Sequence, residues 1–316
     1  MAKYSIVIPV YNRPEEVDEL LESLRQQTYT DFDIVVVEDG SKILCQNIID
    51  QYGDLNINYH YIENRGPGGA RNYGVAHSTG EYIIILDSDC ILPPTYLEQV
   101  DLSFKEYAAD AFGGADKAHS SFTNIQKAIN YSMTSFFTTG GIRGSKKKLD
   151  KFYPRSFNMG MRREVYEALG GFSDMRYGED IDFSIRIFEG GYKCCYFPEA
   201  WVYHKRRTSF GQFFRQVNHS GHARIDLYRR YPNSLKAVHC LPAAFTIGLI
   251  GIILSSVLCG KILYLLLFYA CVILIDSWIK NRHFIVALLS VSASFVQLTG
   301  YGTGFIAEVW RYLRHR

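Results

Sequence analysis

Two apolar runs near the carboxyl end constrain the fold of this chain most. Residues 240–258 contain no charged side chain, and neither do residues 262–275. A membrane-spanning helix needs about 20 apolar residues; the first run has that length, and the second reaches it if residues 276–279 lie at the interface. A buried helical hairpin in a soluble protein is the alternative. The length favours two membrane helices, at about 240–258 and 261–279, joined by a tight turn.

A third weakly polar stretch covers residues 284–307 and is harder to interpret. The segment GYGTG, residues 300–304, falls inside it, and the tail that follows is basic. A full crossing would put this tail on the outer side, against the positive-inside rule. A re-entrant segment, an interfacial helix and two short segments all remain open.

Basic residues flank the predicted hairpin on its outer sides. They are Arg224, Arg229, Arg230 and Lys236 before it, and Lys280 and Arg282 after it. By the positive-inside rule, both ends of the hairpin lie in the cytoplasm. The amino-terminal segment MAKYSIVIPV lacks the length and the cleavage site of a signal peptide, so we expect a first strand there.

Charge and cysteine usage restrict the compartment and the partners. Lys and Arg total 34 and Asp and Glu total 32, a net charge of +2. Bulk electrostatics therefore do not favour nucleic acid, and we expect no nucleic-acid partner. The seven cysteines include no Cys-x-x-Cys pair, which favours a reducing compartment.

Before about residue 238, short β-branched runs alternate with helical patterns. Four strands are predicted within residues 5–10, 32–39, 57–62 and 81–86. Their apolar residues are mostly continuous, as in strands buried on both faces. A helix is predicted over residues 14–26, where apolar residues recur at helical spacing behind Pro14. This order predicts an α/β fold with a doubly wound, mostly parallel sheet, which binds ligands at the carboxyl ends of its strands.

Candidate ligand-binding residues, most of them polar, lie at or after the end of each predicted strand. They are Pro9, Tyr11 and Asn12 after the first, Glu38, Asp39 and Ser41 after the second, Gly69, Arg71 and Asn72 beyond the third, and Asp87, Ser88 and Asp89 after the fourth. Acidic pairs that face one crevice repel each other unless a cation or hydrogen-bond donors lie between them. A divalent metal together with the ribose and base of a nucleotide would meet both needs.

The Asp-x-Asp pair, Asp87 and Asp89, is the sharpest of these signals. Carboxylates on a turn can reach Mg²⁺ or Mn²⁺, which keep open positions for phosphate oxygens. The alternative is a solvated turn in which Asp caps a backbone N–H. His204 ends a strand-like run and is either a further ligand or a structural histidine. The adjacent Arg206 and Arg207 could neutralise a diphosphate.

Two further segments have both a structural and a functional interpretation. Glu179 and Asp180 open a predicted helix, where the helix dipole alone favours acidic residues. Beside a metal–phosphate site, a carboxylate at this position is a candidate general base. The glycine-rich segment 66–74 either packs closely as a helix start or lets backbone approach a ligand, and it lacks the Gly-Lys-Ser/Thr of a Walker loop.

Together these segments resemble the inverting nucleotide-sugar glycosyltransferases of family two, which have the GT-A fold, a Rossmann-like doubly wound sheet. The matching segments, in order, are SIVIPVYNRPEEV, VVVEDGS, GGARNYGV, ILDSDC, NMGMRREVYEALGGFSD, GEDIDFSIRIFEGGY and VYH. They cover roughly residues 4–207. The resemblance implies a hexosyltransferase with a divalent metal, Mn or Mg, and a nucleotide-sugar donor, which we expect to be UDP-linked.

The resemblance also implies roles for individual residues. It places Glu38 and Asp39 on the uridine base, although many members have Asp in place of Glu38. Asp87 then lies near the ribose and the metal, and Asp89 and His204 bind the metal. Asn158 and Met159 belong to the donor-sugar pocket, Glu179 is among the donor-site residues, and Asp180 is the catalytic base. In the implied mechanism, Asp180 takes a proton from an acceptor hydroxyl, whose oxygen displaces the nucleoside diphosphate with inversion.

The carboxyl-terminal part resembles membrane-anchored enzymes of bacterial exopolysaccharide and cell-envelope assembly, through the element GHAR at residues 221–224. This implies a polyprenyl-diphosphate-linked acceptor and a catalytic domain on the cytoplasmic face of the bacterial inner membrane. We predict three parts: a GT-A domain (1–210), a basic interfacial linker (211–238) on the lipid bilayer, and a membrane region (239–316). The basic stretch from Arg143 to Arg155 is either a loop over the acceptor or a solvated loop.

Three alternatives stay open. A processive synthase would carry Gln-x-x-Arg-Trp, whereas Arg215 is followed here by Gln216, so we expect the addition of single sugars. A nucleotidyltransferase would have a glycine-rich, basic loop after the first strand. A non-catalytic, membrane-anchored nucleotide-sugar binding protein would have no need of a base at Asp180.

Overall fold

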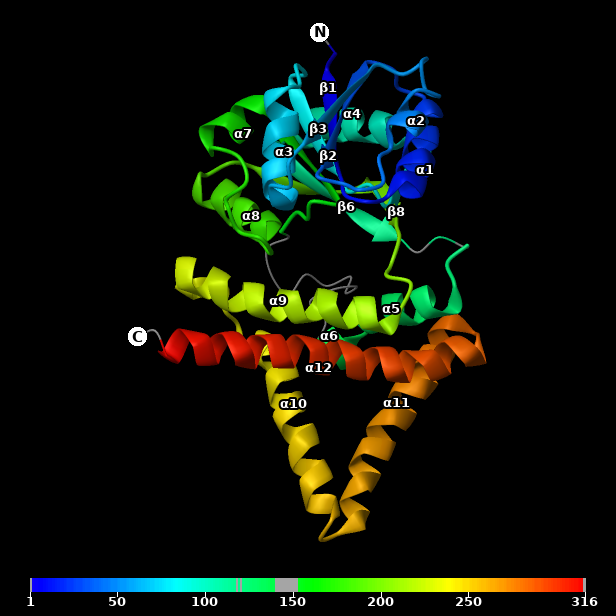
Figure 1. Cartoon of the computed structure of the whole chain (residues 1–316), viewed down its shortest axis with the longest axis vertical. Helices are drawn as coiled ribbons and strands as arrows, with labels where there is room; N and C mark the ends of the chain where they lie inside the picture. Colours follow the sequence, from blue (N-terminus) through cyan, green and yellow to red (C-terminus); the bar gives the residue numbers. More distant parts are fainter. Residues whose placement is uncertain (1, 118, 120, 140–152, 315–316) are drawn as a thin grey trace. The chain divides into compact units, whose positions relative to one another are not determined.

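A computed structural model describes residues 2–117, 119, 121–139 and 153–314 (Figure 1). The chain divides into two compact units. The first comprises Met1–His119 and Phe152–Lys205, and the second comprises Ser120–Lys151 and Arg206–Arg316. Most of the basic stretch from Arg143 to Arg155 lies outside the described residues, so its predicted role stays a prediction.

The first unit is built around one eight-stranded sheet with the order β3–β2–β1–β4–β7–β6–β8–β5. Its strands are β1 (Tyr4–Val10), β2 (Phe32–Asp39), β3 (Ile57–Ile62), β4 (Tyr82–Leu86), β5 (Cys90–Ile91), β6 (Ala111–Lys117), β7 (Asn158–Arg162) and β8 (Cys194–His204). Its helices are α1 (Pro14–Arg25), α2 (Gln46–Ile49), α3 (Gly66–Ala76), α4 (Tyr96–Tyr107), α7 (Arg163–Ala168) and α8 (Glu179–Glu189).

The four predicted strands are confirmed as β1 to β4, and they pair in parallel. Beyond β4 the sheet is mixed, because β7 runs antiparallel to both β4 and β6. The chain winds outward from β1 to β2 and β3, then returns to the other side of β1 as β4. The carboxyl ends of β1 and β4 therefore flank the point where a doubly wound sheet binds its ligand.

Apolar side chains cover both faces of this sheet, which explains why the strands read as continuous apolar runs. On one face, Ile8 shares a core with Leu20 of α1 and Leu97 of α4. On the other face, Val7 shares a core with Phe183 of α8. The predicted helix over residues 14–26 is confirmed, with its regularly spaced apolar residues buried.

The second unit is helical in the residues that the structure describes. Its elements are α5 (Asn124–Thr134), α6 (Phe136–Thr139), α9 (Phe210–Arg230), the short 3-10 helix η1 (Pro232–Ser234), α10 (Ala237–Ser256), the 3-10 turn η2 (Gly260–Ile262), α11 (Leu263–Asn281) and α12 (Phe284–Arg314). The two predicted membrane helices correspond to α10 and α11, and η2 forms the turn between them. α12 lies beside α9 and joins the open ends of this hairpin (Figure 1).

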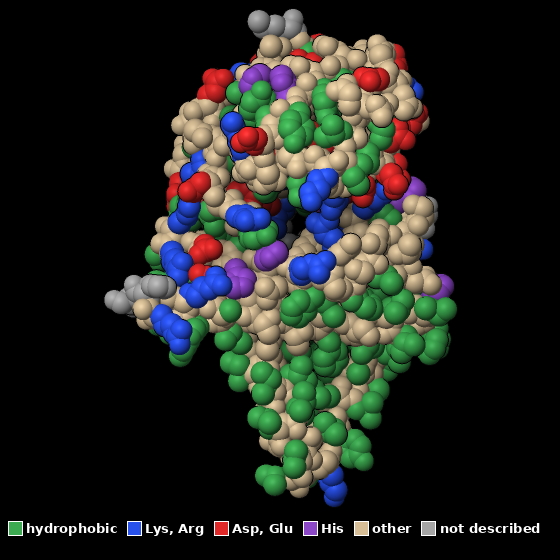
Figure 2. Space-filling view, viewed as in Figure 1, with side chains coloured by type: hydrophobic (Ala, Val, Ile, Leu, Met, Phe, Trp, Pro, Cys, Tyr) green, Lys and Arg blue, Asp and Glu red, His purple; other side chains and the backbone are tan. Residues whose placement is uncertain are grey.

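Three helices are long and apolar enough to cross a membrane, namely Ala237–Ser256, Gly260–Asn281 and Phe284–Arg314. Within the protein, 11% of the apolar window is buried for each of the first two and 39% for the third. Hydrophobic side chains therefore cover the outside of the α10–α11 hairpin, as Figure 2 shows. Such a surface suits a lipid environment rather than water.

The GYGTG segment does not interrupt the third apolar stretch, because α12 continues through it. Its glycines instead allow close packing of helices. A side chain on Gly300 would meet Val217 and Phe214 of α9, and one on Gly304 would overlap the carbonyl oxygen of Asn218. Small residues let helix backbones approach each other in this way. Two short segments, one of the open alternatives, are thereby excluded.

This packing predicts unequal effects for two similar glycine substitutions. Gly304→Ala should lower stability by about 1–3 kcal/mol, because the new methyl group cannot fit against α9. Gly248→Ala in α10 is the matched control, since a side chain there meets no atom within 4 Å; alanine in place of glycine should leave a helix as stable or more so. Thermal unfolding in detergent measures both, and equal midpoints for the two variants would contradict the assignment.

Candidate active site

The turn after β4 carries the two aspartates singled out by the sequence. The Asp87 side chain is 30% exposed, whereas Asp89 and the intervening Ser88 are buried. Asp87 therefore faces solvent in part, while Asp89 depends on partners inside the protein. The turn lies at the carboxyl end of β4, where the topology predicts a ligand.

Arg71 connects this turn to two other segments. Arg71 lies in α3, and its Nη2 donates to Asp87 Oδ1 (2.8 Å) and Ser156 Oγ (2.9 Å). Its Nη1 donates to Glu179 Oε1 (2.7 Å) at the start of α8. Burial opposes the charge of Arg71, but the two carboxylates outweigh it and raise the pKa of the guanidinium. Burial raises the pKa of Glu179, and Arg71 works against this rise. Arg71 is thus a fixed internal cation rather than a mobile surface one.

Asp180 follows Glu179 and begins α8. The preceding Gly178 has φ 82°, a left-handed conformation that favours glycine and turns the chain sharply into the helix. Asp180 Oδ1 accepts a hydrogen bond from the Ile181 backbone N–H (2.8 Å), and its Oδ2 lies 2.9 Å from Arg155 Nε. The carboxylate is therefore oriented on both sides before any substrate arrives.

Asp89 and His204 meet because β8 pairs with β5. Cys90 and His204 are antiparallel partners, and the Lys205 N–H donates to the Asp89 carbonyl oxygen (3.0 Å). This register places His204 Nε2 3.1 Å from Asp89 Oδ1. On its other oxygen, Asp89 accepts a hydrogen bond from Arg13 Nη1 (2.5 Å). Burial disfavours the charge of Arg13, yet Asp89 outweighs it and raises the pKa of that guanidinium.

The chemistry of these donors fits a divalent cation. Ligand atoms of Asp89, Cys90 and His204 all lie within 4.8 Å of one another. His204 Nδ1 is buried and finds no hydrogen-bond partner among the described residues, and the ring stacks on Phe157 with centroids 4.6 Å apart. Carboxylate oxygen and imidazole nitrogen suit Mn²⁺ or Mg²⁺, whereas the Cys90 thiol is buried and burial raises its pKa, which disfavours the thiolate.

The two acidic residues at the end of β2 make different hydrogen bonds. Asp39 Oδ1 accepts a hydrogen bond from the Arg65 backbone N–H (2.6 Å), and burial raises the pKa of this carboxyl. Glu38 is fully buried, and its Oε2 accepts hydrogen bonds from Cys45 N–H (2.9 Å) and Tyr59 O–H (3.0 Å). Glu38 thus holds the loop after β2, and the predicted contact of both residues with a uridine base stays a prediction.

Several predicted ligand contacts are occupied by hydrogen bonds inside the protein. Asn12 Oδ1 accepts a hydrogen bond from the Lys42 backbone N–H (2.7 Å). The Asn12 backbone N–H donates to Ser41 Oγ (2.7 Å). The side chains of Asn12 and Ser41 therefore connect the loop after β1 with the loop after β2. Asn72 bonds both backbone groups of Phe172.

The remaining predicted residues differ in exposure. Asn158 donates to the Ala200 carbonyl (2.9 Å) and accepts from Tyr96 O–H (2.7 Å), while Met159 lies in the core. Pro9 is half-buried, and Gly69 lies in the first turns of α3. Tyr11 is 52% exposed at the end of β1, which leaves its ring available to a ligand.

Arg206 and Arg207 belong to the second unit. Arg206 donates to Asn130 Oδ1 of α5 through Nε (3.2 Å) and Nη2 (3.0 Å). Their predicted contact with a diphosphate stays a prediction.

Arg13, Arg155 and Ser156 were not predicted as site residues, although each contacts one that was. Arg13 directly follows Asn12, so its place after β1 was a usable signal. Arg155 ends the basic stretch noted in the sequence, but nothing local ties it to Asp180, and Ser156 has no local pattern that marks it. Their partners come from distant parts of the chain.

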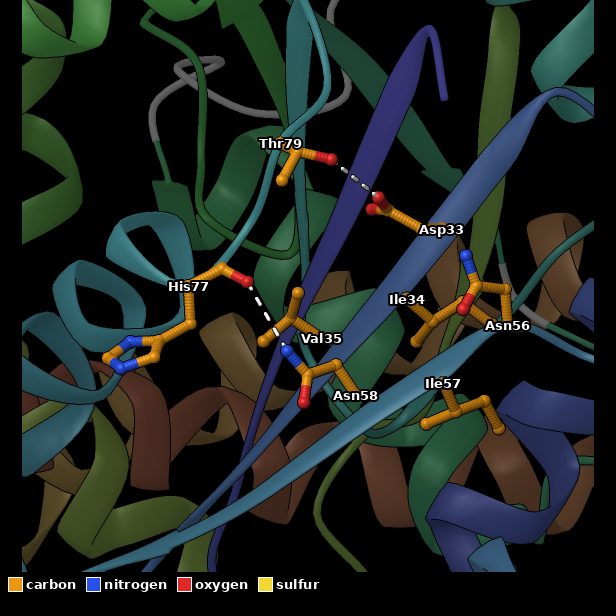
Figure 3. Close-up of a pocket in the computed structure, with 8 residues that line it drawn as sticks. All are labelled: Asp33, Ile34, Val35, Asn56, Ile57, Asn58, His77 and Thr79. Atoms are coloured by element: carbon orange, nitrogen blue, oxygen red, sulfur yellow. Dashed lines mark hydrogen bonds between the residues drawn. The ribbon is translucent and has the colours of Figure 1, made fainter. Parts of the chain in front are cut away.

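A separate cavity of about 340 Å³ lies at the opposite, amino-terminal ends of the strands. Asp33, Asn58, His77 and Thr79 line it, with Thr79 bonded to Asp33 (Figure 3). The cavity shares no residue with the network around Asp87 and Asp89. We therefore do not assign it to the active site.

The sequence is similar to glycosyltransferases. The family model for glycosyl transferase family 2 matches residues 5–170. The chain is 25% identical to the glycosyltransferase AglE of Haloferax volcanii over 261 residues, which cover 77% of this chain and 80% of AglE. It is 33% identical to the poly(ribitol-phosphate) beta-N-acetylglucosaminyltransferase TarS of Staphylococcus aureus over 136 residues, 41% of this chain but only 22% of TarS.

Solved structures show the same fold. A mannosyltransferase, PcManGT from Pyrobaculum calidifontis, in complex with GDP-Man and Mn²⁺, matches 93% of this chain and 87% of its own with a TM-score of 0.65 and 17% identity. TarS 1-349 in complex with UDP-GlcNAc matches 99% of this chain and 92% of its own, with a TM-score of 0.50 and 18% identity. These likenesses confirm the predicted GT-A fold. With the family match spanning more than half of the sequence, the chain belongs to glycosyl transferase family 2 and is a glycosyltransferase.

Proposed function

We propose that this enzyme transfers one sugar, with inversion, from a UDP-linked donor to a lipid-linked acceptor in cell-envelope glycan synthesis. The observation that carries the proposal is the Arg71 network. It joins Asp87 of the Asp-x-Asp turn to Glu179, and Glu179 is the neighbour of Asp180. A donor-binding acid and a candidate base are thereby held in one cluster.

The donor side rests on Asp39 and on the relatives. Asp39 lies at the carboxyl end of β2, fixed by the Arg65 N–H, and its free lone pairs could accept from the N–H of a uracil base. PcManGT was solved with GDP-Man and TarS 1-349 with UDP-GlcNAc, so a nucleotide sugar fits proteins of this fold. The uridine base is our proposal for this chain.

A divalent metal, Mn²⁺ or Mg²⁺, would be held by Asp89 and His204, with Asp87 beside them. When bound, such an ion supplies Lewis-acid stabilisation of the departing diphosphate. The chain itself supplies Arg71 and Arg13 as cations near the same carboxylates. These guanidiniums orient the acidic groups and limit their mutual repulsion.

The transfer step needs one base. Asp180 accepts the proton of an acceptor hydroxyl as that oxygen forms a bond to the anomeric carbon. The bond from this carbon to the diphosphate oxygen breaks, and its electron pair leaves with the nucleoside diphosphate. Arg155 and the Ile181 N–H position the carboxylate for this role. No covalent intermediate on the enzyme is required, and a single displacement inverts the configuration.

The acceptor is proposed from the second unit. The exposed apolar hairpin α10–α11 suits a bilayer, and a polyprenyl-diphosphate-linked sugar is an acceptor that a bilayer delivers. The basic residues that flank the hairpin favour the cytoplasmic face of the cytoplasmic membrane. We keep the division into a catalytic part (1–210), an interfacial segment (211–238) and a membrane region (239–316) as part of this proposal.

Removal of the base should separate chemistry from binding. Asp180→Asn keeps the shape of the side chain but cannot accept the proton, so sugar transfer should fall by at least about 1,000-fold while UDP affinity changes less than about threefold. Glu189→Gln, at the exposed far end of α8, is the control and should transfer normally. Labelled nucleotide sugars with membrane fractions measure transfer, and calorimetry measures UDP binding. Turnover retained by Asp180→Asn would refute its role.

Metal affinity should respond in opposite directions to two neighbours of Asp89. His204→Ala removes a proposed ligand and should weaken Mn²⁺ binding by about 10–100-fold. Arg13→Gln removes the cation bonded to Asp89 and should strengthen Mn²⁺ binding, because the ion no longer competes with a guanidinium. Calorimetric titration of Mn²⁺ without nucleotide measures both. Weaker binding in both variants would show that Arg13 supports the metal rather than competing with it.

A further inference from the structure

α12 has the length of a membrane helix, but its contacts differ from those of α10 and α11. It packs along α9, and the two helices run in the same direction. Gly300 of α12 meets Phe214 of α9, and Phe305 further along meets Gly221. Near its end, the Tyr312 ring lies under the Arg229 guanidinium, 5.1 Å from the ring centroid. The contact therefore covers the second half of α12.

α9 is too polar to lie in hydrocarbon. Its charged and titratable residues are Arg215, His219, His222, Arg224, Asp226, Arg229 and Arg230. If α12 crossed the bilayer, α9 would cross beside it and take these groups into the membrane. Ionisable groups at the bilayer centre are costly, so this arrangement is unfavourable.

Ion pairs also join α9 and α12, in addition to the close packing at the glycines. Glu308 of α12 is buried, and its carboxylate lies 3.0 Å from His222 Nδ1 and 3.3 Å from Arg229 Nη1. Arg311 of α12 adds a third contact at 3.3 Å. α12 thus contains a buried anion with two of its three partners on α9, and separation of the helices would leave it with Arg311 alone.

The opposite side of α12 is apolar and exposed at the two ends of the helix. Between these ends it packs on the hairpin: Gly302 meets Thr246 of α10, and the Phe295 ring lies against Tyr269 of α11. Leu288 near its start and Trp310 and Leu313 near its end are each more than half exposed. At about 100° per residue these three lie on one face, roughly half a turn from Gly304 and Glu308. α12 is therefore amphipathic in the manner of a helix that lies in an interface, with a polar partner on one side and an apolar surface on the other.

Cations mark both ends of this helix. Arg282 precedes it, and Arg311 and Arg314 lie in its last turn. Leu288 and Leu313 are separated by about 37 Å along the axis, more than the roughly 30 Å of a hydrocarbon core. A crossing helix would carry one set of cations to the outer face. A helix in the plane of the membrane keeps both sets beside the anionic headgroups of the cytoplasmic leaflet.

We infer that α12 does not cross the membrane but lies flat in its interface, between α9 on the water side and the lipid, so that only the hairpin α10–α11 enters the bilayer. The occupant of the exposed face of α12 is the interfacial region of an anionic bilayer. The interaction requires no sugar chemistry, so it holds or fails independently of the proposed reaction.

Single cysteines test the side of the membrane on which each segment lies. The full chain first has its five cysteines that are not buried replaced by serine, namely Cys194, Cys195, Cys240, Cys259 and Cys271. It then carries one new accessible cysteine, either Leu313→Cys or Lys261→Cys at the hairpin turn. In sealed vesicles, a membrane-impermeant maleimide should modify these two positions from opposite sides. A third crossing would instead place both on the same side, and modification of both from one side would overturn the inference.

Spin labels test the depth of the same helix in vesicles that contain phosphatidylglycerol. Labels at Leu288, Ser292 and Leu313 should report the same shallow depth, and a label at Ile247 of α10, which is 62% exposed, should lie deeper. A crossing α12 would put Ser292 as deep as Ile247. Circular dichroism of each labelled chain confirms that it has folded, so a depth difference reports position rather than unfolding.

Discussion

A buried guanidinium, that of Arg71, holds together the acidic groups of the amino-terminal unit. Asp87 and Glu179 come from segments far apart in the chain, and both contact Arg71. Without this cation between them, the two carboxylates would repel each other. Breaking a buried ion pair by removal of one partner costs about 3–5 kcal/mol, because the remaining charge is left unpaired. The position of Asp180 depends on this contact, since its neighbour Glu179 anchors the first turn of α8.

The second cation of the site differs from the first in a way that bears on function. Arg71 is almost fully buried, whereas the Arg13 side chain is 29% exposed. Asp89, the partner of Arg13, is also the partner of His204. In the function that we propose, Arg71 maintains the architecture while Arg13 gives way to the bound metal ion. The site would then combine one permanent charge contact with one that a ligand can replace.

Local pattern predicted the elements of the fold well, and the roles of individual polar side chains less well. Continuous apolar runs predicted β1 to β4 because a strand buried on both faces needs no polar residue. A glycine before two acids predicted the start of α8. Whether an amide side chain also bonds protein groups depends on tertiary contacts. The sequence did not predict that Asn72 and Asn158, which stay predicted ligand contacts, bond backbone carbonyl groups.

The same limit applies to residues that only the fold brings together. Arg155 and Ser156 reach Asp180 and Arg71 from the end of the basic stretch, and no local pattern shows which acidic residues they meet. The glycines of GYGTG suggested a break, because glycine is a poor helix former in isolation. Their function became clear only with the backbone of α9 beside them. Periodicity describes one element at a time, whereas these residues act across two.

A structure of the full chain with UDP and Mn²⁺ tests the central claim most directly. The account predicts the ion on Asp89 and His204, the uracil ring beside Asp39, and the Asp180 carboxylate turned toward the diphosphate. A nucleotide bound elsewhere, such as in the cavity beside Asp33 and His77, or an Asp180 side chain directed away from the bound nucleotide, would contradict it.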